Sequence, residues 1–245
     1  MRPDRSLSVP CRGDPSIDCC ECGRLGAYRA TLRAAEPGWF NAPVPSYGDP
    51  AAMLLIVGLA PGRSGANRTG IPFFGDASGD MLLGTLARFG WTCPDGKAQR
   101  GTATPRAGDR NRPPRLNRAM ITNAVRCVPP GNRPNAAEIA ACAPYLQATL
   151  AALPRLCVVL ALGQIAHRAS LRALGRRAAA FPFAHGATHD LGGLRLIDSY
   201  HCSRLNTNTG RLTQAMFEAV FAAIERTINA DRAAMPRQRG FSHAP

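Results

Sequence analysis

Four of the nine cysteines have a spacing that suits a metal centre. Cys19 and Cys22 form a CxxC near the amino terminus, and Cys127 and Cys142 form a second, wider pair. A CxxC places two thiolates on one tight turn, which suits either tetrahedral zinc or an iron–sulfur cluster. Zinc ribbons usually have a second short CxxC, so its absence favours the cluster slightly without deciding the question. Cys20 is an alternative to Cys19, although the resulting CxC is less usual.

A glycine-rich loop over residues 58–78 has the composition of a ligand-binding loop. Its sequence, GLAPGRSGANRTGIPFFGDAS, lets the backbone approach a ligand closely, but it contains neither the GK[ST] of a P-loop nor GxGxxG. Nucleotide hydrolysis is therefore disfavoured. Phe73 and Phe74 either stack on a planar base or belong to the core. Asp76 is either a helix N-cap or a pocket carboxylate that orients water.

A second loop, over residues 201–211, lies in the segment SYHCSRLNTNTGRLT and carries His201. A lone histidine is more often structural than catalytic. Here, however, the residue follows an apolar run, so we expect it at the carboxyl end of a strand, where parallel sheets bind ligands. The other four histidines have no comparable setting.

Alternating apolar runs and helical periodicity predict βα units, and hence an α/β fold with a central, mostly parallel four-stranded sheet. The strands are predicted at residues 53–59, 119–125, 156–162 and 194–199. Helices are predicted at residues 79–89, at 136–153, after Gln164 and from 214 to about 229. Asn135 and Glu138 have the spacing of a capping box, which predicts the start of the second helix. Each predicted strand ends in polar, glycine-rich or histidine-containing residues, so distant segments should form one pocket.

Length and composition predict a single domain over residues 17–229 with flexible ends at 1–16 and 230–245. Residues 92–118, rich in Gly, Pro, Arg and Asn, are predicted to form a long mobile loop. The formal charge of +14 favours a polyanion, above all nucleic acid, as partner. No apolar stretch is long enough to span a bilayer and the start lacks a signal-peptide core, so we expect a cytoplasmic, monomeric protein with reduced cysteines.

Four motifs resemble the uracil-DNA glycosylase superfamily, and most closely its type-B, or family 5, members. They are Cys19-x-x-Cys22-x-Arg24-Leu25, the loop GLAPGxxGANRTGxPFxGDAS, the run ITNAVRCVPPGNRP, and HxSRLNTxTGRLT. The resemblance spans residues 19–224 in the right order. It implies a three-layer αβα fold and a glycosylase that removes uracil, hypoxanthine and xanthine from DNA by base flipping, in base-excision repair.

The resemblance also implies a role for individual residues. A four-iron four-sulfur cluster with a structural role is expected on the cysteines at positions 19, 22, 127 and 142. Phe73 is expected to stack on the flipped base, Asn123 to hydrogen-bond its edge, and His201 to contact the carbonyl that gains negative charge. Leu59 stands where related families carry a carboxylate, so Asp76 becomes the candidate for positioning water or stabilising the sugar.

The expected site is therefore larger than either loop. The catalytic residues are Asp76, Asn123 and His201. The substrate-binding residues are Gly58, Leu59, Ala60, Pro61, Gly62, Phe73, Phe74, Asn123 and His201, and the DNA-binding residues are Ser203, Arg204, Leu205, Asn206 and Arg211. Leu205 is expected to act as a wedge, the alternative being an ordinary exposed leucine. Cys202 departs from the family, which usually has proline after the histidine.

Two other functions compete with a glycosylase. One is an iron–sulfur protein that has lost catalysis and only recognises damaged DNA. The other is a nucleotide-dependent enzyme that uses the first loop to bind phosphate.

Overall fold

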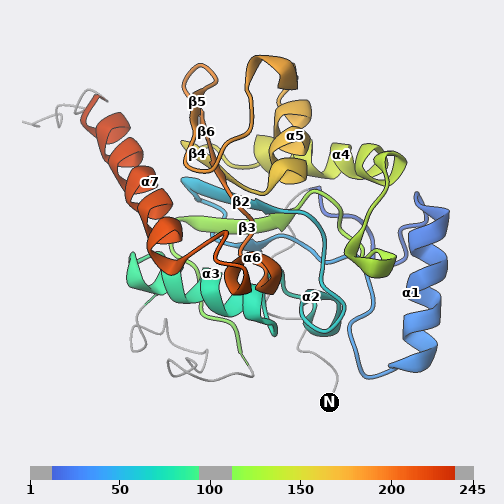
Figure 1. Cartoon of the computed structure of the whole chain (residues 1–245). Coiled ribbons are helices and arrows are strands. Elements are labelled where there is room, and N and C mark those ends of the chain that lie inside the picture. Colours follow the sequence, from blue (N-terminus) through green and yellow to red (C-terminus); the bar gives the residue numbers. More distant parts are fainter. Residues whose placement is uncertain (1–12, 94–111, 235–245) are drawn as a thin grey trace, which may run out of the picture.

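The computed structural model describes residues 13–93 and 112–234. Their strands form one sheet in the order β1-β3-β2-β4-β6-β5, of which β3, β2, β4 and β6 are mutually parallel (Figure 1). The bounds are Tyr47–Gly48 for β1, Leu54–Gly58 for β2, Ala119–Asn123 for β3, Val158–Leu162 for β4, Thr188–Asp190 for β5 and Arg195–Ser199 for β6. The parallel core of the sheet is thus made by the four predicted runs.

The expectation of four strands is wrong, because two short strands extend the sheet. β1 pairs antiparallel with β3, and β5 pairs antiparallel with β6. β1 has only two residues, and β5 has the polar sequence Thr-His-Asp. Neither has the apolar pattern by which a buried strand is predicted, since an edge strand is only partly covered.

Helices cover both faces of the sheet, as expected for a three-layer αβα fold (Figure 1). α3 and α7 lie on one face, and α4 and α5 on the other. The α-helices are α1 (Gly23–Ala35), α2 (Ala66–Thr69), α3 (Ala77–Arg88), α4 (Ala136–Ala151), α5 (Gln164–Ala173), α6 (Arg204–Asn208) and α7 (Gln214–Ala234), and the 3-10 helices are η2 (Pro130–Asn132) and η3 (Ala178–Ala180). None of the helices in the described ranges is both long and apolar enough to cross a bilayer.

The core is divided between the two faces by the alternation of side chains along each strand. On β2, Leu54 and Ile56 pack with α3 and α7, whereas Leu55 and Val57 pack with α4 and α5. All five residues of β2 are buried, and the same holds for β3 and β4. Burial on both faces explains why these strands are continuous apolar runs in the sequence.

The start of α4 agrees with the capping box predicted from the sequence, whereas α1 and the end of α7 differ from the prediction. The Asn135 side chain accepts from the Glu138 backbone N–H at 2.9 Å, and the Asn135 N–H donates to the Glu138 carboxylate at 2.8 Å, so the predicted capping box is confirmed. α1 was not predicted, and α7 continues to Ala234. Of the predicted mobile loop, residues 94–111 lie outside the described residues, as do 1–12 and 235–245.

The topology has a switch point at the carboxyl ends of the central strands. β2 and β4 are adjacent and parallel, yet α3, which follows β2, and α5, which follows β4, lie on opposite faces of the sheet. The connections that leave these strands diverge at this point. Ligands of open parallel sheets bind where connections diverge in this way.

Candidate active site

The carboxyl ends of β2 and β3 bring together the first loop and Asn123. A Cβ added to Gly58 would lie 2.4 Å from Asn123 Oδ1 and 2.5 Å from Phe73 Cε2. Any side chain at position 58 would therefore displace both groups. The Phe73 ring in turn lies 5.7 Å from the His201 ring, at 30°. Three segments predicted to meet, those of Gly58, Asn123 and His201, are thus side by side.

Asn123 is a buried amide whose carbonyl oxygen is unused. The residue is 2% exposed, and its Oδ1 has no hydrogen-bond partner among the described residues. An unpaired buried polar atom costs about 1–3 kcal/mol, and a ligand donor that pairs with it would remove that cost. The oxygen is available to a ligand donor.

Phe73 has a strained backbone. Its φ is 53°, a left-handed value that bulky residues rarely adopt, and it is nevertheless buried. Gly79 packs against it so closely that an added Cβ would lie 2.1 Å from the Phe73 carbonyl oxygen. The first turn of α3 therefore holds the Phe73 backbone in the conformation that brings its ring beside His201.

Asp76 fulfils the first of the two alternatives that its position suggested. It is the N-cap of α3, and its Oδ1 accepts from the Gly79 N–H at 3.0 Å. Its Oδ2 faces the glycines of the first loop, where a Cβ added to Gly65 would lie 2.2 Å away and one added to Gly62 3.1 Å away. One carboxylate oxygen thus fixes the helix, while the other lies against the loop.

His201 is held as a neutral imidazole. Burial lowers its pKa below the ordinary value, and the negative charge of Asp76 opposes this shift. Its backbone carbonyl accepts from Asn206 Nδ2 at 2.8 Å. A neutral ring near Phe73 and Asp76 can donate one N–H to a ligand without bringing a full charge into the pocket.

The remaining residues of the first loop contribute mainly hydrogen bonds of their backbone. Beyond the end of the strand pair, the N–H groups of Ala124 and Val125 donate to the carbonyls of Gly58 and Leu59. Leu59 and Ala60 are half-buried and Pro61 is buried. Phe74 is half-buried, and its carbonyl accepts from Thr69 Oγ1 at 3.2 Å.

The second loop contains the short helix α6, with Ser203 at its N-cap. Arg204 is exposed, and Leu205, the residue expected as a wedge, is 73% exposed. Two residues expected to bind DNA also make contacts within the protein. Asn206 bonds the His201 carbonyl as described above, and the Arg211 guanidinium lies 4.6 Å from the centre of the Tyr200 ring.

Cys202, the departure from the family pattern, joins the two loops. Its Sγ donates to the Ser78 carbonyl in the first turn of α3 at 3.4 Å, a weak hydrogen bond. The residue is buried, and burial raises the pKa of its thiol to about 12. The thiol is therefore protonated and inert.

The four expected cysteine ligands lie near one another although they come from distant segments. Cys127 and Cys142 are buried with Leu25, and Cys22 packs against them. Burial, reinforced by neighbouring cysteines, raises the pKa of Cys22 to about 11, and burial raises that of Cys127 to about 12.

Cys19 belongs to this group. Its sulfur lies 3.8 Å from the hydroxyl of Tyr145 and interacts electrostatically with Cys22 and Cys127. The adjacent Cys20 is exposed, so the structure favours Cys19 over the alternative.

The donor set fits a metal centre built on thiolates. Cys127 and Cys142 are buried, Cys22 packs against them, and the Cys19 sulfur lies beside the hydroxyl of Tyr145. Four convergent cysteines are ligands that both structural zinc sites and iron–sulfur clusters use. A separate group, made of His167, His189 and Asp198, also brings possible metal-ligand atoms close together.

The histidine–aspartate group is a hydrogen-bonded network. Asp198 Oδ1 lies 2.7 Å from His167 Nδ1, and its Oδ2 lies 3.1 Å from His189 Nε2. The other ring nitrogen of His167 lies 2.8 Å from the Phe181 carbonyl. These contacts stabilise the buried carboxylate and link α5, β5 and β6.

A salt bridge joins the two halves of the cysteine site. Arg24, in the first turn of α1, donates through Nε and Nη2 to the two oxygens of Glu138, each at 2.7 Å. This contact is the main cause that lowers the pKa of Glu138. Because Glu138 also completes the cap of α4, the bridge ties the helix after Cys22 to the helix that carries Cys142.

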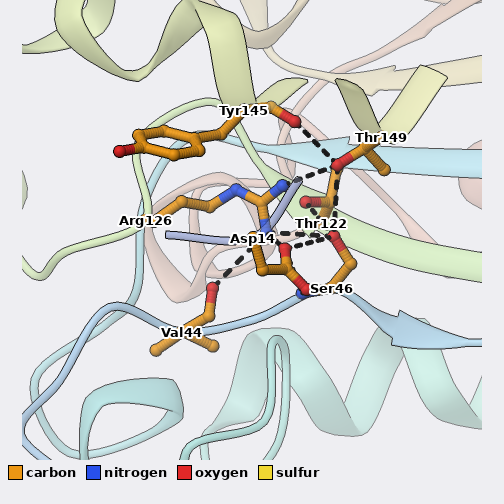
Figure 2. A network of polar contacts seen from close by, with 7 residues as sticks. All are labelled: Asp14, Val44, Ser46, Thr122, Arg126, Tyr145 and Thr149. Carbon is orange, nitrogen blue, oxygen red and sulfur yellow. Dashed lines mark hydrogen bonds and ion pairs between the residues drawn. The ribbon is translucent and has the colours of Figure 1, made fainter. Parts of the chain in front are cut away.

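A buried polar network next to Cys127 was not foreseen. Figure 2 shows the Arg126 guanidinium surrounded by oxygen atoms. It donates to Asp14 at 2.7 Å, Ser46 at 3.0 Å and Thr149 at 2.8 Å. The side chains of Arg126 and Asp14 are only 1% and 6% exposed. Asp14 lies in the segment expected to be flexible, yet it is bound into the domain.

Comparison with known proteins identifies the family of this chain. A family model described as the uracil DNA glycosylase superfamily matches residues 45–225. A type-5 uracil-DNA glycosylase of Thermus thermophilus is 45% identical over 215 residues, covering 85% of this chain and 93% of the relative. A type-5 uracil-DNA glycosylase of Pyrobaculum aerophilum is 41% identical over 202 residues, which cover 80% of this chain and 83% of the relative. One of Mycobacterium tuberculosis is 39% identical over 213 residues, which cover 83% of this chain and 75% of the relative. The chain therefore belongs to the uracil-DNA glycosylase superfamily, with type-5 enzymes among its similar relatives.

Proposed function

We propose that the protein is a monofunctional DNA glycosylase that hydrolyses the N-glycosidic bond of uracil and other deaminated bases. One observation carries the proposal: the buried Asn123 amide oxygen, without a partner among the described residues, lies beside the ring of Phe73. This pairing offers a stacking face and a polar edge to one planar base. The names of the type-5 relatives support uracil as a substrate.

The chemistry of deamination explains why one amide should serve several substrates. Loss of an amino group leaves a carbonyl beside a ring N–H, and uracil, hypoxanthine and xanthine share this pair. Asn123 can accept from the N–H through Oδ1 and donate to the carbonyl through Nδ2. Cytosine and adenine present the reverse pattern. This contact therefore discriminates uracil from cytosine and hypoxanthine from adenine, whereas thymine and guanine, which share the pair, must be excluded by other contacts.

Catalysis is proposed to rest on His201 and Asp76. As the glycosidic bond breaks, positive charge develops on the sugar and negative charge on the leaving base. The neutral His201 donates a hydrogen bond to a carbonyl of that base. Asp76 Oδ2 stabilises the sugar and positions the water that adds to it. A preorganised donor of this kind contributes about 10²–10³-fold in rate.

The second loop is proposed to extract the base from the duplex. Unstacking a nucleotide costs a few kcal/mol, and the side chain of an exposed Leu205 can fill the vacated space. Ser203 and the exposed Arg204 are proposed to bind DNA phosphates. The net charge of +14 favours this association electrostatically.

We propose that Cys19, Cys22, Cys127 and Cys142 hold a four-iron four-sulfur cluster. When bound, the cluster supplies a structural cross-link between α1, the segment after β3 and α4. Cys127→Ala should abolish the brown colour and the absorbance near 400 nm. Cys157→Ala is the matched control, since Cys157 lies immediately before β4 and its thiol contacts the Arg155 carbonyl. Equal absorbance in the two variants would contradict the assignment.

The activity is tested on synthetic duplexes that contain one uracil, hypoxanthine or xanthine, with a cytosine duplex as control. We expect base release that leaves an alkali-labile abasic site. His201→Ala and Asp76→Ala should lose most activity while still binding DNA. Binding without release by the cluster-loaded protein would support damage recognition without catalysis instead.

A further inference from the structure

The backbone immediately before His201 is fixed on both sides. The Tyr200 N–H donates to His185 Nδ1 at 3.1 Å, and the Tyr200 carbonyl accepts from Ser199 Oγ at 2.9 Å. Ser199 is buried at the end of β6. The orientation of the Ser199–Tyr200 peptide, one residue before the peptide that enters His201, therefore depends on a side chain from elsewhere in the chain, that of His185.

His185 also packs against Tyr200. The two rings are stacked, with centroids 4.9 Å apart and planes 15° apart. His185 comes from the segment between η3 and β5, and the Gly186 N–H after it donates to the Asp198 carbonyl on β6. The imidazole is thus held by ring stacking and by its own backbone.

The hydrogen bond from Tyr200 defines the protonation state of His185. A ring nitrogen that accepts from an N–H carries no proton, so the imidazole is neutral with its proton on Nε2. Burial lowers the pKa of His185 below its ordinary value, opposed by a hydrogen bond to the Met216 backbone. Geometry and burial therefore favour the same state.

We propose that His185 is a positioning residue for His201, whose unprotonated Nδ1 holds the backbone that presents His201 to the substrate. The inference rests on the proposed glycosylase function. Protonation at acid pH places a proton on Nδ1, which then faces the Tyr200 N–H donor instead of accepting from it. The hydrogen bond is lost, which releases the Ser199–Tyr200 peptide and with it the backbone that leads to His201.

The groups around His185 come from several elements. Arg211 of the second loop packs its guanidinium over the ring of Tyr200, on which His185 stacks, and α7 contributes the Met216 backbone. On the side of β5 and α5, the Phe183 ring contacts both Tyr200 and His167. His167 and His189 are bonded to Asp198. The Asp198 carboxylate is thus engaged by these two histidines, and no hydrogen bond joins it to His185 among the described contacts.

Asparagine and glutamine variants test the role of Nδ1. The Oδ1 of asparagine can replace Nδ1 as an acceptor but does not titrate, whereas the longer glutamine reaches the position of Nε2. Under single-turnover conditions at pH 7.5, we expect His185→Asn to excise uracil within about threefold of the wild-type rate. His185→Gln and His185→Ala should be about tenfold slower, because they leave the Tyr200 N–H unpaired.

The pH dependence distinguishes positioning from packing. Between pH 7.5 and 5.5 the wild-type rate should fall, and His185→Asn should lose a smaller fraction of its rate. An acid loss in His185→Asn equal to that of the wild type assigns the titration to another group, such as His201, and overturns the proposal. Wild-type behaviour of His185→Ala at both pH values also overturns it.

Amide hydrogen exchange provides a readout that is independent of excision. At pH 7.5 the Tyr200 amide should be protected in the wild type and in His185→Asn, and should exchange about tenfold faster in His185→Ala. Equal protection in the three proteins overturns the contact itself. Failure of the wild-type protein to release uracil, with protection as expected, overturns the proposed function alone.

Discussion

The candidate active site and the cysteine region differ in how their buried polar groups are hydrogen-bonded. In the pocket, Asn123 Oδ1 is buried without a partner among the described residues, and Phe73 has a φ of 53°. Beside the cysteines, Arg24 and Glu138 are joined by two hydrogen bonds, and Arg126 is surrounded by acceptors. The first region has a strained backbone and an unpaired amide oxygen, whereas in the second the charges of Glu138 and Arg126 are each paired with an opposite charge.

The difference follows from what each region must do. A group that is to bind a ligand cannot be fully bonded within the protein, so the free protein bears a cost that the ligand removes. A region that joins distant segments stabilises the fold only if its buried charges are paired. Substitutions in the candidate active site should therefore affect mainly activity, and substitutions beside the cysteines should affect mainly stability.

The largest effect is expected in the pocket, on activity alone. Asn123→Ala removes the group that recognises the base, so single-turnover excision should fall by about 10³-fold. Because the lost oxygen has no partner, the free energy of unfolding should change by less than about 1 kcal/mol. Excision assays and urea unfolding measure the two quantities. A large loss of stability would show that Asn123 is mainly structural.

The Asp14–Arg126 pair should show the reverse. Asp14→Ala leaves a buried guanidinium without its carboxylate, which should lower the free energy of unfolding by about 3 kcal/mol. Asp18→Ala is the matched control, because Asp18 is 72% exposed in its contact with Arg33 and should cost less than about 1 kcal/mol. Similar stability of the two variants would contradict the role given to the network.

Acid should destabilise the pocket side through its buried histidines. Burial lowers the pKa values of His185 and His201, so below the unfolded value of about 6.5 the unfolded chain binds more protons than the folded one. The stability contributed by the neutral rings is present above that pH and is lost as the pH falls through the folded pKa values. Urea unfolding from pH 7.5 to 5.5 should show this decline, and His185→Asn should make it shallower.

The smallest effect is expected at the exposed tip of the second loop. Leu205→Ala should leave the free energy of unfolding unchanged, because the side chain packs little in the free protein. Excision from duplex DNA should fall by about fivefold, while excision from single-stranded DNA, where less stacking is broken, should change less. An equal effect on both substrates would contradict a wedge.

Most of the parallel sheet could be predicted from the sequence, but its edges and one long-range contact could not. Burial on both faces gives the four central strands apolar runs, whereas β1 and β5 have no such pattern. The pairing of Asp14 with Arg126 joins residues separated by 112 positions, with no local signal at Asp14. Periodicity reports how an element is buried, not which distant partner it meets.

The sequence by itself determined the family and the four central strands, and it supplied the candidate site residues of the two loops, because motifs and buried strands are local patterns. Only the tertiary structure decided how those residues are used. It shows that Asp76 caps α3 while facing the first loop, that Asn123 is left without a partner among the described residues, and that Asn206 bonds its own loop. These outcomes depend on the direction of each side chain and on segments far away in the chain, which spacing does not encode.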